Sequence, residues 1–285
     1  MSEKQAFDVL DTVLKDGQPW EKVHAAEFLI ALGKTGSVQD VFLKELDQNG
    51  HQPEYRIGIW RVLYKCAEEN EKQIWQDSIY NAFILSESPD RIHAAETLAK
   101  LKITAKNTDV EIVESAIASP DQRLSFFSQW WITPQNEGGI EKLKAYLLPI
   151  IQSDEKSVIR YLAAYVLCED TDLSINTGEW QILQDIAVSE PVDSDVRLQL
   201  LTAAFSKADN DSIQATSLRN IKKMMLEYTN STKSNVYQLC VALARKGGAE
   251  DIGLLKSLLH HHENDVKIAA AYAMQQINNQ TNHSN

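Results

Sequence analysis

Hydrophobic residues recur three and four positions apart along most of this chain, which is the spacing of a helix that buries one face. Two segments show the pattern most plainly, because KVHAAEFLIAL at 22–32 and DRIHAAETLAKLK at 90–102 are near-copies of each other. In each, an aliphatic residue (Val23 or Ile92) is followed by His and then by Ala-Ala-Glu. Near-copies within one chain indicate an internal repeat. We therefore predict that both segments form the same helix of a repeating unit.

The alternation of helical pattern and break predicts eight helical hairpins, or about sixteen helices, with an outer and an inner helix in each. The breaks carry Pro, Gly, Asp or Asn, which favour turns. Alternating hydrophobic and polar residues between hairpin turns are not found in the sequence, so we expect no β-sheet. The predicted outer and inner segments are 4–15 with 22–32, 38–46 with 55–65, 71–86 with 90–103, 109–118 with 122–132, 138–151 with a helix from 159, a helix from about 179 with one from 196, a helix from about 211 with one from 236, and both helices of the last pair within 254–274.

Each inner helix opens on an apolar anchor, and the anchors lie about 35 residues apart on average. They are Val23, Tyr55, Ile92, Leu124, Ile159, Val196, Val236 and Val266. A helical hairpin of this length cannot bury its own apolar face, so its neighbours must cover it. The expected fold class is therefore all-α, an α-solenoid formed by one domain over 1–279, with a disordered polar tail at 280–285.

Polar residues also recur around the anchors. The residue after the anchor is basic or His in six of the eight units, while Ser125 and Tyr237 depart from the pattern. Acidic residues stand just before several anchors, and Pro149 falls inside a predicted outer helix. The residues that follow the anchors are His24, Arg56, His93, Ser125, Arg160, Arg197, Tyr237 and Lys267.

In these features the chain resembles HEAT repeats, including the HEAT-like units of the phycobilisome-lyase type. The resemblance implies a right-handed α-α superhelix whose inner helices line the concave side. It also implies a polar ladder between neighbouring repeats, formed by an acidic residue in the turn and the basic residue after the anchor. The pairs that match this ladder are Asp90 with His93, Asp195 with Arg197, and Asp265 with Lys267.

Composition narrows the function classes. A formal net charge of -12 argues against a nucleic-acid partner, because affinity for the phosphate backbone depends on clustered Lys and Arg. The sequence has no apolar run long enough to span a membrane and no signal-peptide pattern, so we expect a cytoplasmic protein without a membrane partner. Cys66, Cys168 and Cys240 lie far apart within helical patterns, which favours small buried hydrophobes over a disulfide or metal site.

Catalytic motifs do not stand out. His24 with Glu27, and His93 with Glu96, share a helix face at a spacing of three, but stacked helices would place the two pairs roughly 20 Å apart, too far to share one metal. The HEAT-like deoxyhypusine hydroxylases hold iron with His-Glu dipeptides, whereas the only such dipeptide here, His262-Glu263, falls in a predicted turn. A HEAT-like DNA glycosylase would need a basic groove, and the first four inner helices mix basic with acidic residues. We therefore expect no cofactor, no metal and no catalytic residue.

The first four inner helices combine polar groups with large aromatic residues, as binding surfaces do. Neighbouring residues on a helix diverge by about 100°, so at least one of Trp130 and Trp131 is expected to be exposed. The favoured function is a non-catalytic scaffold that binds a protein or peptide on the concave face; the alternative is a lyase-type or isomerase-type enzyme, or a small-ligand binder, that uses the same groove. The predicted binding residues are His24, Glu27, Arg56, Trp60, His93, Glu96 and Trp130.

Overall fold

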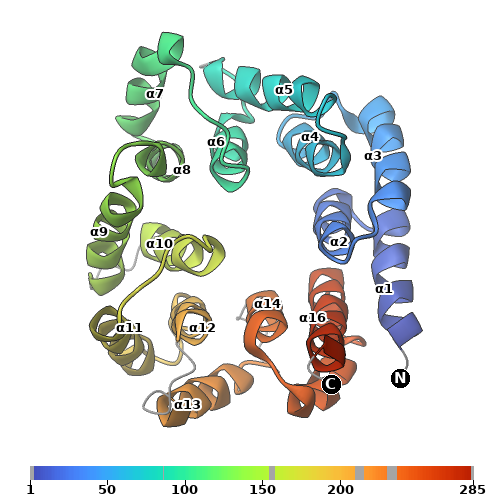
Figure 1. The fold of residues 1–285 in the computed structure, drawn as a ribbon, viewed down its shortest axis with the longest axis vertical. Coiled ribbons are helices and arrows are strands. Elements are labelled where there is room, and N and C mark those ends of the chain that lie inside the picture. The colour runs from blue at the N-terminus through green and yellow to red at the C-terminus, as the bar shows by residue number, and fades with distance from the viewer. Residues whose placement is uncertain (1–2, 86, 154–157, 209–214, 230–235, 284–285) are drawn as a thin grey trace. The chain divides into compact units, whose positions relative to one another are not determined.

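The computed structural model describes residues 3–85, 87–153, 158–208, 215–229 and 236–283, and every regular element within these ranges is a helix (Figure 1). The prediction of an all-α chain with about sixteen helices is confirmed over the same ranges. The α-helices are α1 (Glu3–Asp16), α2 (Pro19–Ala31), α3 (Thr35–Asn49), α4 (Tyr55–Cys66), α5 (Lys72–Ile84), α6 (Arg91–Lys100), α7 (Val110–Ile117), α8 (Gln122–Ile132), α9 (Gly139–Gln152), α10 (Val158–Glu169), α11 (Thr177–Ser189), α12 (Arg197–Lys207), α13 (Ala215–Leu226), α14 (Val236–Lys246), α15 (Ile252–Leu258) and α16 (Asn264–His283). Short 3-10 helices occupy η1 (Asn107–Asp109), η2 (Thr133–Gln135) and η3 (Ala249–Asp251).

The chain divides into two compact units: the first comprises Met1–Gly139 with Glu263–Ile268, and the second Ile140–His262 with Ala269–Asn285. In the first unit, α1 packs on α2, α3 on α4, α5 on α6 and α7 on α8, and the even-numbered helices α2, α4, α6 and α8 also pack on one another in chain order. In the second unit, α11 and α13 both pack on α12, and α10, α12 and α14 follow one another in the same way. The even-numbered helices correspond to the predicted inner helices.

Small residues let the even-numbered helices approach closely. Ala25, Ala26, Ala94 and Ala95 are fully buried in α2 and α6. At Gly58 in α4, a Cβ atom would lie 2.8 Å from the Cγ2 atom of Val23, so the contact between α2 and α4 has no room for a side chain there. The interior is thus built from helices packed too tightly to accept larger residues at these points.

Two predicted boundaries fall at the limits of the described residues. The polar tail was expected from 280; α16 is described to His283, and residues 284–285 lie outside the described ranges. The expected start of an outer helix near 211 also lies outside the described residues, where α13 is described from Ala215. Pro149 does lie inside α9, as predicted.

The start of α4 is fixed by a strained turn. Glu54 has a φ of 66° and a ψ of -57°, and the Tyr55 N–H donates to the Pro53 carbonyl at 2.8 Å, which is the pattern of a γ-turn with positive φ. Such a backbone is costly for a residue with a side chain and persists only where its surroundings enforce it. Here Tyr55 is held by a 3.0 Å hydrogen bond from its hydroxyl to Glu45. The turn therefore begins α4 at a defined residue and sets the direction of its side chains.

Ion pairs join neighbouring hairpins near the starts of the even-numbered helices. Arg56 in α4 pairs with Asp90 at the start of α6, and Arg160 in α10 pairs at 2.8 Å with Glu190, which begins the loop between α11 and α12. The expected partnership of Asp90 with His93 is wrong, because the fully buried Asp90 accepts from Arg56 and Ser88 instead. The Asp90 side chain makes no hydrogen bond to the first turn of α6 and meets Arg56 of α4 instead.

Lysines make a second set of links at the opposite helix ends. Lys207, in the last turn of α12, donates to the carbonyls of Asp170 at 2.8 Å and Leu173 at 2.6 Å, just after α10. Lys246, at the end of α14, donates to the carbonyl of Ala208, which follows α12. Carbonyls at a helix C-terminus lack partners within the helix, and a nearby cation satisfies them. Each lysine therefore caps the even-numbered helix that precedes its own.

Candidate functional site

The seven predicted binding residues lie on the even-numbered helices α2, α4, α6 and α8 of the first unit, six of them in pairs three or four residues apart and Trp130 alone. His24 and Glu27 are on α2, Arg56 and Trp60 on α4, His93 and Glu96 on α6, and Trp130 on α8. Six of them are partly exposed, whereas Trp130 is buried. Except for His24, the structure brings the predicted residues of α2, α4 and α6 into two polar groups, one toward each end of the helices.

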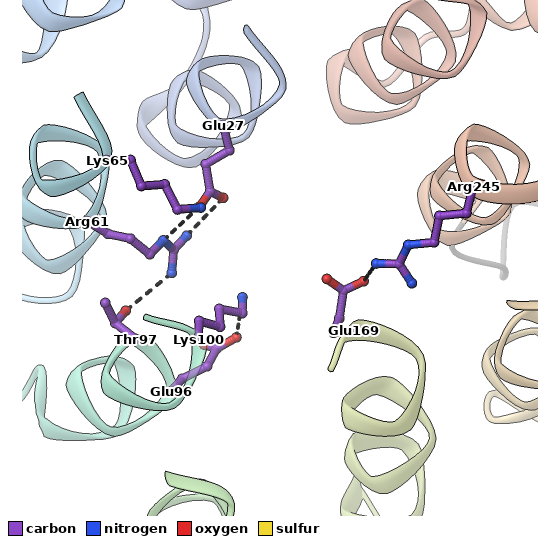
Figure 2. A network of polar contacts seen from close by, with 8 residues as sticks. All are labelled: Glu27, Arg61, Lys65, Glu96, Thr97, Lys100, Glu169 and Arg245. Carbon is purple, nitrogen blue, oxygen red and sulfur yellow. Dashed lines mark hydrogen bonds and ion pairs between the residues drawn. The ribbon is translucent and has the colours of Figure 1, made fainter. Parts of the chain in front are cut away.

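The first group is centred on Arg61 of α4. Its Nε atom lies 3.0 Å from Oε1 of Glu27 in α2, and Nη2 donates to Oε2 of the same carboxylate at 3.2 Å (Figure 2). Its Nη1 atom donates to the Thr97 hydroxyl in α6 at 3.3 Å. Arg61 therefore ties three helices together through one guanidinium, a geometry that suits its fixed fork of donors.

Two lysines complete this group. Lys65, one turn after Arg61, donates to Oε1 of Glu27 at 2.7 Å, and Lys100 pairs with Glu96 at 2.8 Å within α6 (Figure 2). The side chain of Arg61 is 4% exposed, while those of Lys65 and Lys100 are 34% and 24% exposed. We call the whole set the charged network: Glu27, Arg61, Lys65, Glu96, Thr97 and Lys100. Its arginine is interior, and its lysines and carboxylates reach the surface.

The two carboxylates of the charged network are held in their ionised form. Burial alone would raise the pKa of Glu27, but Arg61, Lys65 and Lys100 hold that pKa far below its ordinary value. Burial would also raise the pKa of Glu96, but the positive charges of Lys100 and Arg61 outweigh this effect. The pKa of Glu96 is therefore lowered as well. A carboxylate that stays ionised cannot deliver a proton near neutral pH. The charged network is therefore suited to ion pairing rather than to acid catalysis.

The second group lies nearer the starts of α4 and α6. Arg56, besides its ion pair with Asp90, places its guanidinium 5.4 Å from the centre of the Trp60 ring. The His93 ring stacks on Trp20 with a centroid separation of 5.2 Å, and its Nε2 atom lies 3.8 Å from the Glu54 carboxylate. Burial lowers the pKa of His93 against the opposing pull of Glu96 and Glu54.

His24 is not joined to either group by the contacts described above. Its Nδ1 atom lies 2.9 Å from the Asp265 carboxylate, which also belongs to the first unit. The expected pairing of Asp265 with Lys267 is therefore not the one seen, since Lys267 donates to Asn264 instead. His24 thus acts as a polar link to the start of α16.

The expectation that Trp130 or Trp131 is exposed is wrong. Their exposed fractions are 3% and 2%. The Trp131 indole N–H donates to the Ile103 carbonyl at 2.6 Å, and its ring meets the edge of Phe83 at 4.8 Å between centroids. Because α6 and α7 both pack on α8, the apolar face of α8 is wide enough to take neighbouring tryptophans. Trp130 is therefore part of the interior, not of the site.

Arg61, Lys65 and Lys100 were missed as site residues by reasoning from the sequence. A signal for them exists, because Arg61 and Lys65 share a face of α4 at a spacing of four, as Glu96 and Lys100 do on α6. Sequence spacing does not reveal that Arg61 reaches both Glu27 and Thr97, which lie 34 and 36 residues away.

The three cysteines carry free thiols. Cys168 and Cys240 are buried and Cys66 is partly buried. Burial raises the pKa of Cys66 to about 11 and that of Cys240 to about 12. A thiol with so high a pKa is a poor nucleophile at neutral pH, as expected for cysteines that serve as small hydrophobes.

Other kinds of site were sought over the same described residues. In this part of the chain, no three His, Cys, Asp or Glu side chains come together in a way that would hold a metal ion. Nor does any helix there combine the length and the apolar character needed to cross a membrane. Comparisons with protein-family models, with curated proteins and with solved structures find no match to this chain.

Proposed function

We propose that this chain is a non-catalytic scaffold that binds a protein or peptide through the charged network on α2, α4 and α6. The observation that carries the proposal is the link made by Arg61, which fixes Glu27 and Thr97 while leaving Lys65 and Lys100 partly exposed. Two cations and two carboxylates, paired as Lys65 with Glu27 and Lys100 with Glu96, lie across the three even-numbered helices α2, α4 and α6. A partner segment with complementary charges would meet an ordered surface.

Order in the unbound state favours binding. A charged side chain that is already held loses little conformational freedom when a partner arrives, and complementary charges select the partner and its register. Arg56 and Trp60 add a stacked aromatic and guanidinium pair on α4, and these two residue types dominate binding energies at protein interfaces. Both are partly exposed.

The carboxylates of the charged network are poorly suited to a catalytic role. Glu27 and Glu96, the carboxylates of the charged network, each have a cationic partner and a lowered pKa. An acid catalyst needs a pKa near the working pH, usually raised by burial without such partners. A scaffold requires only that these groups keep their charge, which the arrangement favours.

We further propose a right-handed superhelix of the HEAT-like type as the architecture. Two observations support it: the even-numbered helices pack in chain order within each unit, and acidic residues in the turns meet basic residues of the preceding hairpin. Repeats joined only to their neighbours form extended binding surfaces. A cytoplasmic location is supported by the free state of the three cysteines.

The proposal is tested by replacing Lys65 and Lys100 together with Ala and measuring which proteins co-purify from the native host. Both lysines are partly exposed, so we expect only a small fall in melting temperature and a clear loss of captured protein. Lys15→Ala is the matched control, because Lys15 forms an exposed ion pair with Asp11 on α1 and belongs to no part of the charged network. Equal capture by the double variant and by the control would refute the proposed site.

Trp60→Ala provides a second, independent variant. If Trp60 anchors a partner, its removal reduces capture per folded molecule while the melting temperature changes little. If Trp60 serves only to fill space, its loss lowers the melting temperature, and capture per folded molecule stays the same. The second outcome would remove Trp60 from the site.

A further inference from the structure

A cavity of about 500 Å³ lies in the second unit, between the start of α10 and the loop that joins α11 to α12. None of its lining residues belongs to the charged network. Its walls combine apolar side chains, one tyrosine and several charged groups. The lining residues are Val158, Arg160, Tyr161, Glu190, Pro191, Asp193, Ser194, Asp195 and Val196.

The buried charges of this cavity are already paired with each other. Arg160 and Glu190 are 5% and 9% exposed and form a 2.8 Å ion pair. Arg160 Nε also donates to the Ile151 carbonyl at 3.0 Å, and the Ser194 hydroxyl donates to the second oxygen of Glu190 at 2.5 Å. These two side chains therefore balance each other and serve to hold the loop against α10.

The loop is ordered by further hydrogen bonds. The Ser194 N–H donates to the Pro191 carbonyl at 3.0 Å, and the Val196 N–H donates to the Ser194 hydroxyl at 3.4 Å. From the other side, the Tyr228 hydroxyl donates to the Val192 carbonyl at 3.0 Å. A loop fixed in this way presents its side chains without a large entropic penalty on binding.

Two further carboxylates on this loop determine the net charge of the cavity lining. Asp193 and Asp195 stand on either side of Ser194, and both are exposed. With the pair of Arg160 and Glu190 balanced, these two aspartates leave the lining negatively charged. An anionic ligand is therefore disfavoured, and a cationic one is attracted.

We propose that this cavity binds an organic cation, a guanidinium or ammonium group on an apolar stem, such as an arginine or lysine side chain. The charged head meets Asp193 and Asp195, and the stem packs on Val158 and Val196. The ring of Tyr161 lines the same space and can attract a cation through its face. Partly apolar walls and a volume of about 500 Å³ suit such a group better than a bare metal ion.

The test is an NMR titration of the full chain with N-acetyl-arginine amide, using N-acetyl-citrulline amide as a neutral probe of the same shape. We expect the backbone signals of 193–196 to shift with the arginine probe and not with the citrulline probe, and the shift to weaken as salt is added. The double change Asp193→Asn with Asp195→Asn should weaken binding about tenfold, since two exposed ion pairs are lost. Absence of shifts, or equal shifts with the neutral probe, would overturn the proposal.

Asp185→Asn in α11 is the control for net charge, because Asp185 is exposed in the second unit and does not line the cavity. If this control weakens binding as much as the double change, attraction is general to an acidic chain and the proposed site is wrong. The variant Lys65→Ala with Lys100→Ala should bind the arginine probe normally, which separates this inference from the scaffold function.

A second titration identifies the source of the cation. A short peptide with one arginine between apolar residues should bind more tightly than the capped amino acid if the natural ligand is a partner's side chain. Equal affinity indicates a free small cation instead. Both results support an organic-cation site, whereas a peptide and an amino acid that both fail to bind exclude it.

Discussion

Replacing Arg61 by Ala tests the central claim that one guanidinium holds α2, α4 and α6 together. The change removes both contacts to Glu27 and the hydrogen bond to Thr97, together with the packing of the Arg61 stem, whose side chain is 4% exposed. Breaking a buried ion pair by removing one partner typically costs about 3 to 5 kcal/mol. Glu27 keeps Lys65 at 2.7 Å, so it is not left without a cation. We therefore expect Arg61→Ala to lower the free energy of unfolding by about 3 kcal/mol, at the lower end of that range.

Lys65→Ala supplies the comparison within the same network. The Lys65 side chain is 34% exposed, and Glu27 keeps both contacts to Arg61 when Lys65 is removed. Exposed ion pairs contribute about 1 kcal/mol or less. Arg61→Ala and Lys65→Ala each remove a cation from Glu27. The losses in free energy of unfolding should nevertheless differ by about 2 kcal/mol.

The assay must report on the first unit, because a chain of two compact units need not unfold in one step. Amide hydrogen exchange in α2, α4 and α6 measures the local free energy of opening, and a cycle with Glu27→Gln isolates the coupling between Glu27 and Arg61. The reasoning is refuted if Arg61→Ala costs no more than Lys65→Ala. It is also refuted if the cycle finds no coupling between Glu27 and Arg61.

Three further predictions concern the interior and the response to acid. Trp131→Phe removes the hydrogen bond to Ile103 together with part of a buried ring system and should cost about 2 kcal/mol, measured by urea denaturation; a neutral effect would contradict the burial described. Ala95→Leu should cost about 1 to 3 kcal/mol through overpacking, whereas Ala118→Leu at an exposed position should cost little; similar melting of the two variants would mean that the helix faces are misassigned. Because the pKa of Glu27 is lowered from its ordinary value of 4.5, its stabilising effect is complete above that pH and is lost as the pH falls below it. Glu27→Gln should therefore reduce the difference between the free energies of unfolding at pH 7 and pH 3, and an unchanged difference would argue against the ion pairs.

The helices were predictable because each hairpin repeats a local pattern. The inner segment predicted at 90–103 corresponds to α6 at 91–100, and the segment at 122–132 corresponds to α8. Such periodicity depends only on which residues share a helix face. The end of α16 was harder to predict for a similar local reason, since Asn and Gln at 278–280 give a weak helix signal yet lie within α16.

The site was predicted only in part, because its contacts join residues far apart in sequence. Glu27 and Glu96 were identified from their polar character on predicted inner helices, but the residue that links their helices is Arg61. Trp130 was assigned to the surface because neighbouring positions on a helix diverge, and that rule fails where two helices flank a third. Burial on two sides is a property of packing that periodicity in a single helix does not reveal.

Lys207 and Lys246, which donate to carbonyls at the ends of preceding helices, are synthesised on the ribosome after those helices. A chain emerges from its N-terminus, so α10 is made before Lys207, and α12 is made before Lys246. The carbonyls at Asp170, Leu173 and Ala208 therefore lack their lysine donors until the next helix of the unit has appeared, although the Asp170 carbonyl still accepts from the Leu173 N–H at 3.3 Å. Both α10 and α12 thus acquire bonds at their C-terminal ends only when later helices appear, and a nascent chain paused after α12 would hold α12 still open at its last turn and α10 still without the hydrogen bond from Arg245 in α14 to the Cys168 carbonyl.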